Sequence, residues 1–109
     1  MSDAKKSPAH QAFGDVAPKL ADMTEQWLFG DIWERPGLPK RDRSVITVAV
    51  LTALYRIEQL PFHLNRALDN GVTKEELVEL ITHVTMYAGW PTGASAIMLA
   101  KKVFAERGV

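Results

Sequence analysis

The stretch PFHLNRALDNGVTKEEL, residues 61–77, holds the end of one helix and the start of the next. Its first proline fits the first turn of a helix, and the apolar spacing predicts that this helix covers residues 61–69. The pair Asn70-Gly71 then suits the left-handed conformation in which many helices end. Thr73 has a glutamate three residues later, the signature of a capping box, so the next helix is predicted to begin at Thr73.

Upstream of this stretch, residues 39–55 are almost wholly apolar after four charged residues near the start, and only Ser44, Thr47 and Thr52 interrupt the run. The β-branched content would suit a buried strand, but the length and the polar opening favour a helix. A helix that is apolar on every side has to be covered on every side. We therefore expect a subunit interface to cover what neighbouring helices leave open.

Downstream, the helix that begins at Thr73 carries an apolar stripe at helical spacing, namely Leu77, Leu80, Ile81, Val84 and Ala88. Residues 89–91 form a break, and the last helix is predicted to begin at Pro91 or Thr92. The helix at residues 39–55 and this last helix therefore add two to the helices on either side of Asn70-Gly71.

Toward the amino terminus, we expect a short helix from Ser7-Pro8 to Phe13 and a second one that carries Trp27. His10 is expected to face solvent. The fold class is therefore predicted to be all-α, with about six helices. Residues 1–6 are predicted to form a disordered tail, and residues 7–109 a single domain.

The composition restricts the function. The chain has 109 residues, 13 basic and 13 acidic side chains, and no cysteine. A balanced charge argues against nucleic-acid binding, which needs a clustered basic excess. The uncharged runs are too short to span a membrane, and the amino terminus lacks the apolar centre of a signal peptide. Without cysteine, thiol chemistry is excluded and a cytoplasmic location is the expectation.

His63 is the leading candidate for chemistry, because it lies in the first turn of a helix with two charged neighbours. Glu58 precedes that helix, and Arg66 follows His63 by one turn. A carboxylate beside an imidazole raises the pKa of the imidazole and fixes its tautomer, which suits acid–base catalysis near neutral pH. The alternative is a histidine whose hydrogen bonds are purely structural.

Other candidates are less specific. His83 and Tyr87 are one turn apart and share one edge of their helix, where they would line a cavity or simply border the core. Trp90 would form the wall of a pocket or part of the core. Arg43 would bind a carboxylate at a helix start or be a solvated charge. The histidines lack the spacing of a helical metal site, so no metal is expected.

Three segments together resemble the carboxymuconolactone decarboxylase family: PKRDRSVITVA (39–49), EQLPFHLNRALDNGVTKEEL (58–77) and HVTMYAGWP (83–91). The similarity extends from about Trp27 to Ala105. It implies the helical fold shared with alkyl hydroperoxidase D, assembled into trimers or hexamers through the apolar helix.

The resemblance also separates two chemistries. The peroxidase branch uses a Cys-x-x-Cys pair before a histidine that looks equivalent to His63, and here those positions hold Arg56 and Gln59. A glutamate that assists this branch falls near Ser44. Peroxide reduction by a thiolate is therefore disfavoured, because the chain has no cysteine.

The other branch is similar to enzymes of aromatic catabolism that decarboxylate 4-carboxymuconolactone without a cofactor. On this interpretation His63 is the acid–base residue, Glu58 orients it, and Arg43 or Arg66 holds a substrate carboxylate. His83, Tyr87 and Trp90 complete the candidate substrate-binding set. The competing hypothesis is a non-catalytic oligomeric domain that binds a small molecule or a partner protein.

Overall fold

The computed structural model describes residues 7–109, so the predicted tail at residues 1–6 lies outside the described residues. Within the described range the chain forms six α-helices and no strand, which confirms the all-α prediction. The chain divides into two compact units, of which the first ends at Leu38 and the second begins at Pro39. The prediction that residues 7–109 form a single domain stays a prediction.

The first unit consists of short helices. Helix α2 (Pro8–Phe13) is capped by Ser7, as predicted, and α3 (Pro18–Met23) continues into a π-helical segment, η1 (Thr24–Phe29), before the short 3₁₀ turn η2 (Ile32–Glu34). The looser winding of η1 breaks the regular period that the sequence suggested. Trp27 in this segment is 62% exposed on this unit.

His10 joins the two α-helices of the first unit. Its Nδ1 lies 2.7 Å from the hydroxyl of Ser7, and its Nε2 lies 2.8 Å from a carboxylate oxygen of Asp22. The side chain of His10 is only 11% exposed. The expectation of a solvent-facing His10 was therefore wrong, because a helix cap and a carboxylate hold the ring on both sides.

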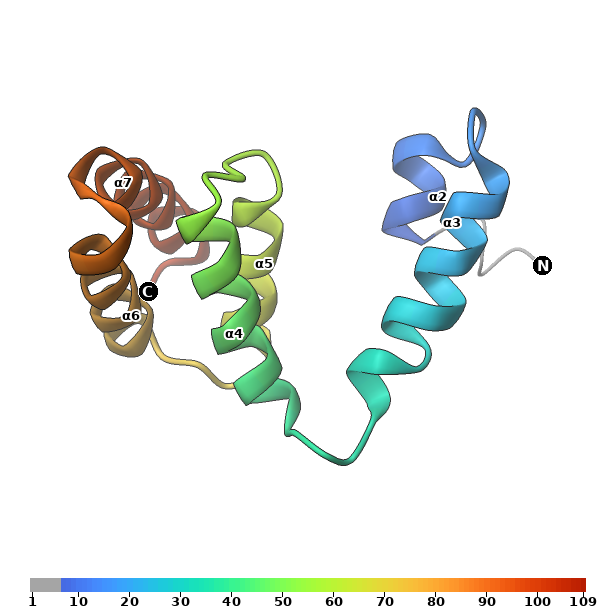
Figure 1. Ribbon diagram of the computed structural model, residues 1–109, viewed down its shortest axis with the longest axis horizontal. Helices are drawn as coiled ribbons and strands as arrows, with labels where there is room; N and C mark the ends of the chain where they lie inside the picture. Colours follow the sequence, from blue (N-terminus) through green and yellow to red (C-terminus); the bar gives the residue numbers. More distant parts are fainter. Residues whose placement is uncertain (1–6) are drawn as a thin grey trace. The chain divides into compact units, whose positions relative to one another are not determined.

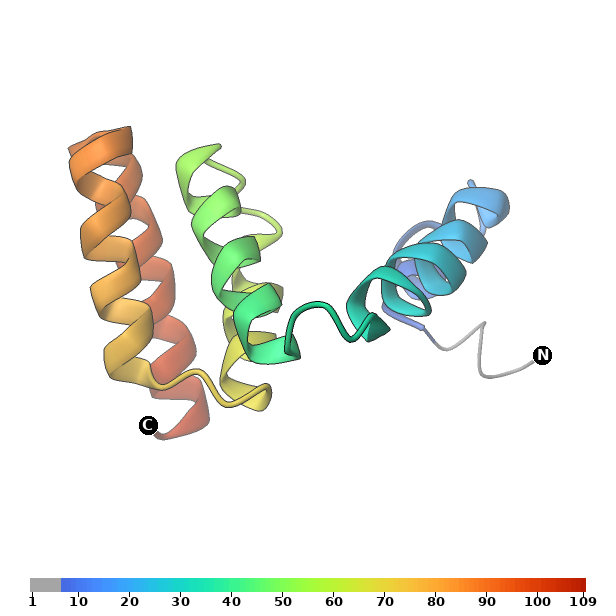
Figure 2. The same cartoon turned by 60° about the horizontal axis from the view of Figure 1, so that its bottom comes forward.

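The second unit is a four-helix arrangement of α4 (Lys40–Ala53), α5 (Leu60–Asp69), α6 (Lys74–Ala88) and α7 (Trp90–Arg107). In Figures 1 and 2, α4 runs beside α5 and α6 runs beside α7. The run with β-branched residues is helical, as predicted. The capping box at Thr73 is also confirmed, because Thr73 and Glu76 each accept a hydrogen bond from the other's backbone N–H.

The core of the second unit draws on all four helices and on Val72 in the turn after α5. Its buried apolar members are Val48, Leu60, Leu64, Ala67, Val72, Leu77, Ile81, Ala96, Ala100, Val103 and Phe104. From the stripe predicted on α6, Leu77 and Ile81 are buried and Leu80 packs against them. Burial of these side chains supplies the main stabilisation of this unit.

The break between α6 and α7 is a single residue. Gly89 has φ of 111°, a conformation that a residue with a Cβ rarely adopts. Trp90 already belongs to α7, so the last helix begins one or two residues earlier than predicted. Further along, a Cβ on Gly93 would lie 2.7 Å from Cβ of Thr85, so only glycine lets α7 approach α6 this closely.

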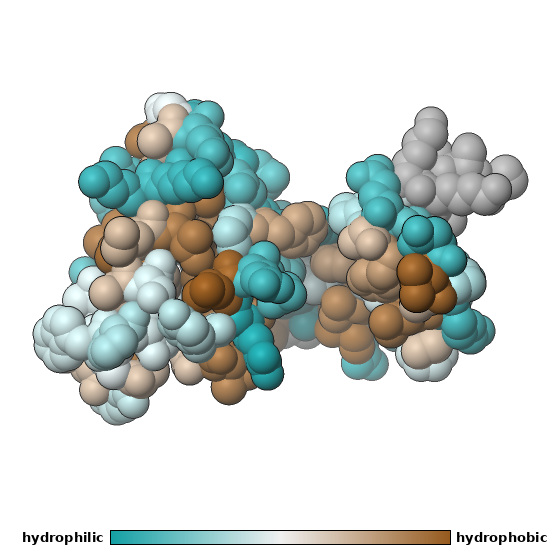
Figure 3. Space-filling view, turned by 90° about the horizontal axis from the view of Figure 1, so that it is seen from above, coloured by the Kyte–Doolittle hydropathy of each residue, from teal (hydrophilic) through white to brown (hydrophobic). Residues whose placement is uncertain are grey.

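Much apolar surface remains exposed. On α4, Ile46, Val50 and Leu54 are each about half exposed, at 49%, 47% and 60%. Figure 3 shows apolar side chains on the surface of both units. Among the described residues, no helix is long and apolar enough to cross a membrane.

Candidate functional site

His63 lies in the first turn of α5 and is half-buried, with its Nδ1 atom shielded from solvent. Burial lowers the pKa of His63 below its usual value of 6.5, and the positive charge of Arg66 lowers it further. The sequence predicted the opposite direction, through Glu58. The expectation failed because desolvation and the Arg66 cation, and not the Glu58 carboxylate, are the causes of the shift.

Phe62 connects His63 with Arg66. The rings of Phe62 and His63 meet edge to face, with centroids 5.0 Å apart, and the guanidinium carbon of Arg66 lies 5.7 Å from the centroid of the Phe62 ring. The aromatic face stabilises the arginine cation through a cation–π interaction. The first two turns of α5 thus hold an imidazole, an aromatic ring and a cation together.

Glu58 lies in the segment between α4 and α5 and is exposed. The path of this segment is set by Tyr55, whose φ of 60° is left-handed, and by the Arg56 N–H, which donates to the carbonyl of Leu51 at 2.8 Å. These features form a helix C-cap that turns the chain toward α5. A role for Glu58 in orienting His63 stays a prediction.

Arg43 stands in the first turn of α4 and is half-buried. The neighbouring Ser44 is buried, and its hydroxyl accepts a hydrogen bond of 3.0 Å from the side-chain amide of Asn70 at the end of α5. We call the facing sides of these two antiparallel helices the α4–α5 seam. At a rise of about 1.5 Å per residue, His63 lies about 10 Å along α5 from Asn70. Arg43 and His63 therefore occupy opposite ends of the seam.

His83 and Tyr87 come together as the sequence predicted. Their ring centroids are 5.2 Å apart. They line a cavity of about 420 Å³ between α4 and α6, which we call the α4–α6 cavity; its other lining residues are Ala49, Val50, Ala53, Val84 and Ala88. The cavity combines an apolar lining with two polar aromatic side chains, but Tyr87 is 83% exposed, so the cavity is open to solvent on the second unit.

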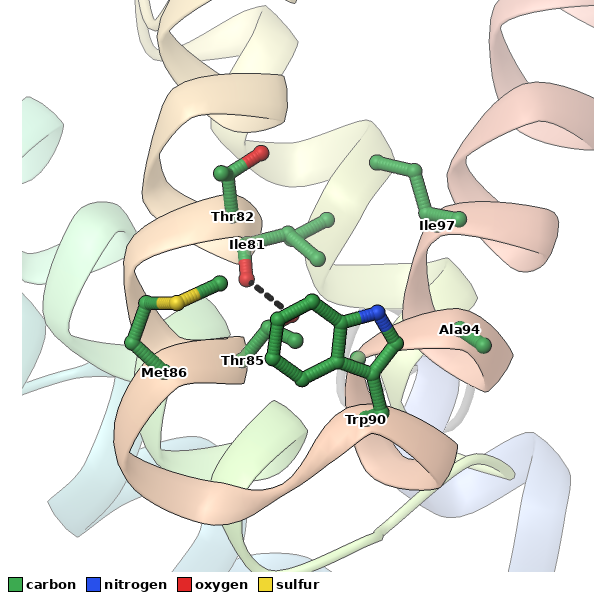
Figure 4. A pocket seen from close by; sticks show the side chains of 8 residues that line it. Ile81, Thr82, Thr85, Met86, Trp90, Ala94 and Ile97 are labelled. Atoms are coloured by element: carbon green, nitrogen blue, oxygen red, sulfur yellow. Dashed lines mark hydrogen bonds between the residues drawn. The ribbon is translucent and has the colours of Figure 1, made fainter.

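Trp90 lies at a different place. It lines a cavity of about 290 Å³ between α6 and α7, together with Thr82, Thr85 and Met86. Figure 4 shows the Trp90 ring near Met86 and Thr85, with the Thr85 hydroxyl bonded to the carbonyl of Ile81. Within one chain the predicted residues thus fall into three groups: the α4–α5 seam, the α4–α6 cavity and this α6–α7 cavity.

Two polar features were missed by the sequence analysis. The Ser7–His10–Asp22 chain of hydrogen bonds has no spacing signal that distinguishes it from an ordinary helix cap. Thr52 is 2% exposed, and among the described residues its hydroxyl has no hydrogen-bond partner. The sequence did contain a sign of this feature, because Thr52 is one of the three polar residues that interrupt the apolar run at residues 39–55. The described residues also contain no group of three side chains placed to hold a metal ion.

Comparison with known proteins gives consistent matches. The model of the carboxymuconolactone decarboxylase family matches residues 18–102. A 4-carboxymuconolactone decarboxylase from Acinetobacter baylyi is 46% identical over 95 residues, which cover 87% of this chain and 71% of that protein. A nitrosuccinic acid decarboxylase from Metarhizium robertsii is 31% identical over 81 residues, which cover 74% of this chain and 57% of that protein.

Proposed function

Because this chain belongs to the carboxymuconolactone decarboxylase family, we propose that it removes carbon dioxide from a small lactone or keto carboxylate, with 4-carboxymuconolactone as the first substrate to test. The two decarboxylases among its relatives support a carboxy-lyase. The observation that carries the proposal is the half-buried imidazole of His63, held beside the cation of Arg66.

The reaction needs no cofactor in principle. When the carboxylate leaves as carbon dioxide, its bonding electron pair passes into the conjugated carbonyl of the substrate and forms an enolate. A hydrogen-bond donor placed at the carbonyl oxygen stabilises that charge. A proton is then added to carbon, so each turnover consumes one proton and releases one carbon dioxide.

His63 supports both steps. Its lowered pKa favours the neutral imidazole at pH 7, which donates one N–H hydrogen bond. To protonate carbon in the second step, His63 has to take up a proton from solvent and pass it on. We assign the enolate contact and the proton transfer to His63, with Glu58 as its orienting carboxylate. Arg66, beside His63, would hold a substrate carboxylate, a task for which a guanidinium is well suited. The same role for Arg43, at the opposite end of the seam, stays a prediction.

The proposal includes His83, Tyr87 and Trp90 because the chain is proposed to form a homo-oligomer. His83 and Tyr87 lie beside the exposed apolar side of α4, where a second copy would enclose the α4–α6 cavity. Trp90 is the candidate at the α6–α7 cavity. We therefore propose a homo-oligomer, a trimer or a hexamer, that acts on a small molecule in the cytoplasm, a location consistent with a chain that has no cysteine.

The direct test uses the purified chain and 4-carboxymuconolactone, with release of carbon dioxide and loss of the lactone followed together. We expect carbon dioxide and lactone loss in equal amounts, at a rate above that of a heat-unfolded control sample. A folded protein that releases no carbon dioxide from this or from related lactone and keto carboxylates would contradict the proposal.

One observation favours a second candidate function, the binding of a small molecule without catalysis. The α4–α6 cavity is apolar and carries two polar rings, so it would suit a domain that binds a small molecule without converting it. Tight binding of a lactone with no carbon dioxide release would identify that function. Peroxidase activity through a thiolate stays disfavoured, because no cysteine is present.

A further inference from the structure

The chain contains two asparagines, Asn65 and Asn70, and only Asn70 is followed by a glycine. The backbone nitrogen of the next residue attacks an asparagine side chain by closing a five-membered ring. Glycine hinders this attack least, because it has no side chain. Gly71 is also exposed, and a Cβ added to it would meet no atom within 4 Å. Asn70-Gly71 is therefore a sequence and a surrounding that favour ring closure.

The fold holds this site in an unreactive conformation. Ring closure needs the Gly71 nitrogen and Cβ of Asn70 on the same side of the Asn70 Cα–C bond, but ψ of 7° places the two atoms on far sides. The Gly71 N–H donates to the carbonyl of Leu68 at 3.2 Å. The Asn70 N–H donates to the carbonyl of Arg66 at 2.9 Å. The last turn of α5 therefore has to open before the reaction begins.

A contact from another helix holds that turn closed. The side-chain amide of Asn70 donates a hydrogen bond of 3.0 Å to the hydroxyl of Ser44, which is 1% exposed on α4. The bond fixes the amide group that has to turn toward the Gly71 nitrogen during ring closure. Asn65 lies inside α5, where its amide donates to the carbonyl of Pro61 at 3.0 Å. Of the two asparagines, Asn70 is thus the one whose amide is held by a neighbouring helix.

We propose that Asn70 is a site of spontaneous deamidation, and that its hydrogen bond to Ser44 limits the rate of this modification. The Gly71 nitrogen loses its proton and bonds to Cγ of Asn70, and the side-chain nitrogen leaves as ammonia, so that a succinimide forms. Water then opens the ring at one of its two carbonyls. One opening gives an aspartyl residue, and the other gives an isoaspartyl residue whose main chain runs through the former side chain. The sum is one water consumed and one ammonia released, with no oxidation or reduction.

Both products weaken the α4–α5 seam. The aspartyl product has a negative charge at the carboxyl end of α5, directly after Asp69, where the helix dipole disfavours it. The isoaspartyl product lengthens the main chain just before Val72, which is 2% exposed and whose N–H donates to the carbonyl of Ala67 at 2.9 Å. Deamidation therefore loosens the second unit at the turn between α5 and α6.

The test follows deamidation in the full chain by mass spectrometry of the peptides that contain Asn65 and Asn70. Samples are incubated at mildly alkaline pH, both folded and unfolded in urea. Ser44→Ala removes the acceptor of the Asn70 amide and keeps a good helix former. Thr47→Ala is the matched control on α4, because its hydroxyl is bonded within that helix, to the carbonyl of Arg43 at 2.8 Å. A urea titration checks that each variant folds, and Ser44→Cys, a weaker acceptor of similar size, replaces a Ser44→Ala chain that does not.

In urea we expect Asn70 to deamidate while Asn65 persists, and the rate at Asn70 should be the same in wild type, Ser44→Ala and Thr47→Ala. Gly71→Ala, compared in urea only, should slow the reaction, because its methyl group hinders the attacking nitrogen. In the folded wild type Asn70 should react at least about 10-fold more slowly than in urea, since the helix end has to open first. Ser44→Ala should raise the folded rate by about 3-fold to 10-fold, the usual effect of one hydrogen bond, whereas Thr47→Ala should leave it unchanged.

Three results would overturn the inference. An Asn70 that stays intact in urea would show that it is no deamidation site, and equal rates in folded and unfolded wild type would show that the fold does not protect it. A folded Ser44→Ala chain that reacts at the wild-type rate would show that the bond to Ser44 has no part in that protection. The effect on the seam is measured separately with Asn70→Asp, whose urea midpoint should fall below that of wild type; an unchanged midpoint would contradict the weakening.

Discussion

At the residue scale, two influences favour the neutral form of His63. Burial in the first turn of α5 lowers its pKa because the imidazolium loses solvation, and the nearby Arg66 cation repels a second positive charge. The Phe62 ring lies beside both groups. With a lowered pKa, His63 is better suited to donate a hydrogen bond to an enolate as a neutral imidazole than to act as a permanently charged acid.

The lowered pKa predicts how stability depends on pH. Below pH 6.5 the unfolded chain protonates this histidine more readily than the folded chain does, so the contribution of His63 is fully present above pH 6.5 and is lost as pH falls toward its lower folded pKa. We expect urea unfolding to show that wild type loses more stability between pH 7.5 and pH 5 than His63→Gln does. Equal losses in the two proteins would contradict the direction of the shift.

The sequence could predict only part of this residue-level arrangement. The proximity of His63 and Arg66 follows from their spacing on one helix, and so does the pairing of His83 with Tyr87. The burial of His63 depends on how α4 lies against α5, which no local pattern contains. For this reason the pKa direction was predicted wrongly.

At the element scale, the start of α7 is tied to α6 by close packing. The position of Gly93 leaves no room for a Cβ beside Thr85, whose own hydroxyl is bonded back to Ile81 at 2.7 Å. Helix propensity alone would favour alanine over glycine by about 1 kcal/mol. The close approach reverses that preference, because overpacking costs more.

We expect Gly93→Ala to lower the free energy of unfolding by about 1–3 kcal/mol, the usual cost of overpacking. Thr85→Ala should remove only part of that effect in the double variant, because it removes Oγ1 and Cγ2 of Thr85 but leaves its Cβ, 2.7 Å from the new methyl group. Chemical denaturation of the four proteins measures this coupling. Additive effects of the two substitutions would show that the clash is relieved elsewhere.

Helix ends were more predictable than helix winding. The Asn70-Gly71 turn, the Thr73 capping box and the Ser7 cap appear where their side chains predicted them. These signals act within three or four residues, so they survive any tertiary arrangement. The π-helical winding of η1 has no such local signal, which is why the sequence suggested a regular helix through Trp27.

At the scale of the whole molecule, the second unit by itself leaves the apolar side of α4 exposed. Ile46 and Leu54 are 49% and 60% exposed although they belong to the most apolar run of the sequence. The zero formal net charge of the chain offers little repulsion against self-association. Both facts support the proposed oligomer.

We expect light scattering to give a mass three or six times that of one chain at micromolar concentration. Ile46→Glu should shift the protein toward the monomer, because a charge on this face would be buried without a partner, while Ile46→Ala should leave the assembly in place. A monomeric wild type would contradict the oligomer, and an assembly unaffected by Ile46→Glu would locate the interface elsewhere.

The central claim is that His63 performs the proton chemistry of a decarboxylation, and turnover of His63→Gln tests it most directly. Carbon dioxide release from 4-carboxymuconolactone is measured for wild type and for this variant, with circular dichroism and the urea midpoint as checks on the fold. The account predicts that kcat falls by about 100-fold or more, since acid–base groups typically contribute 10²–10⁴-fold, while the variant stays folded. Wild-type turnover in a folded His63→Gln protein would contradict it.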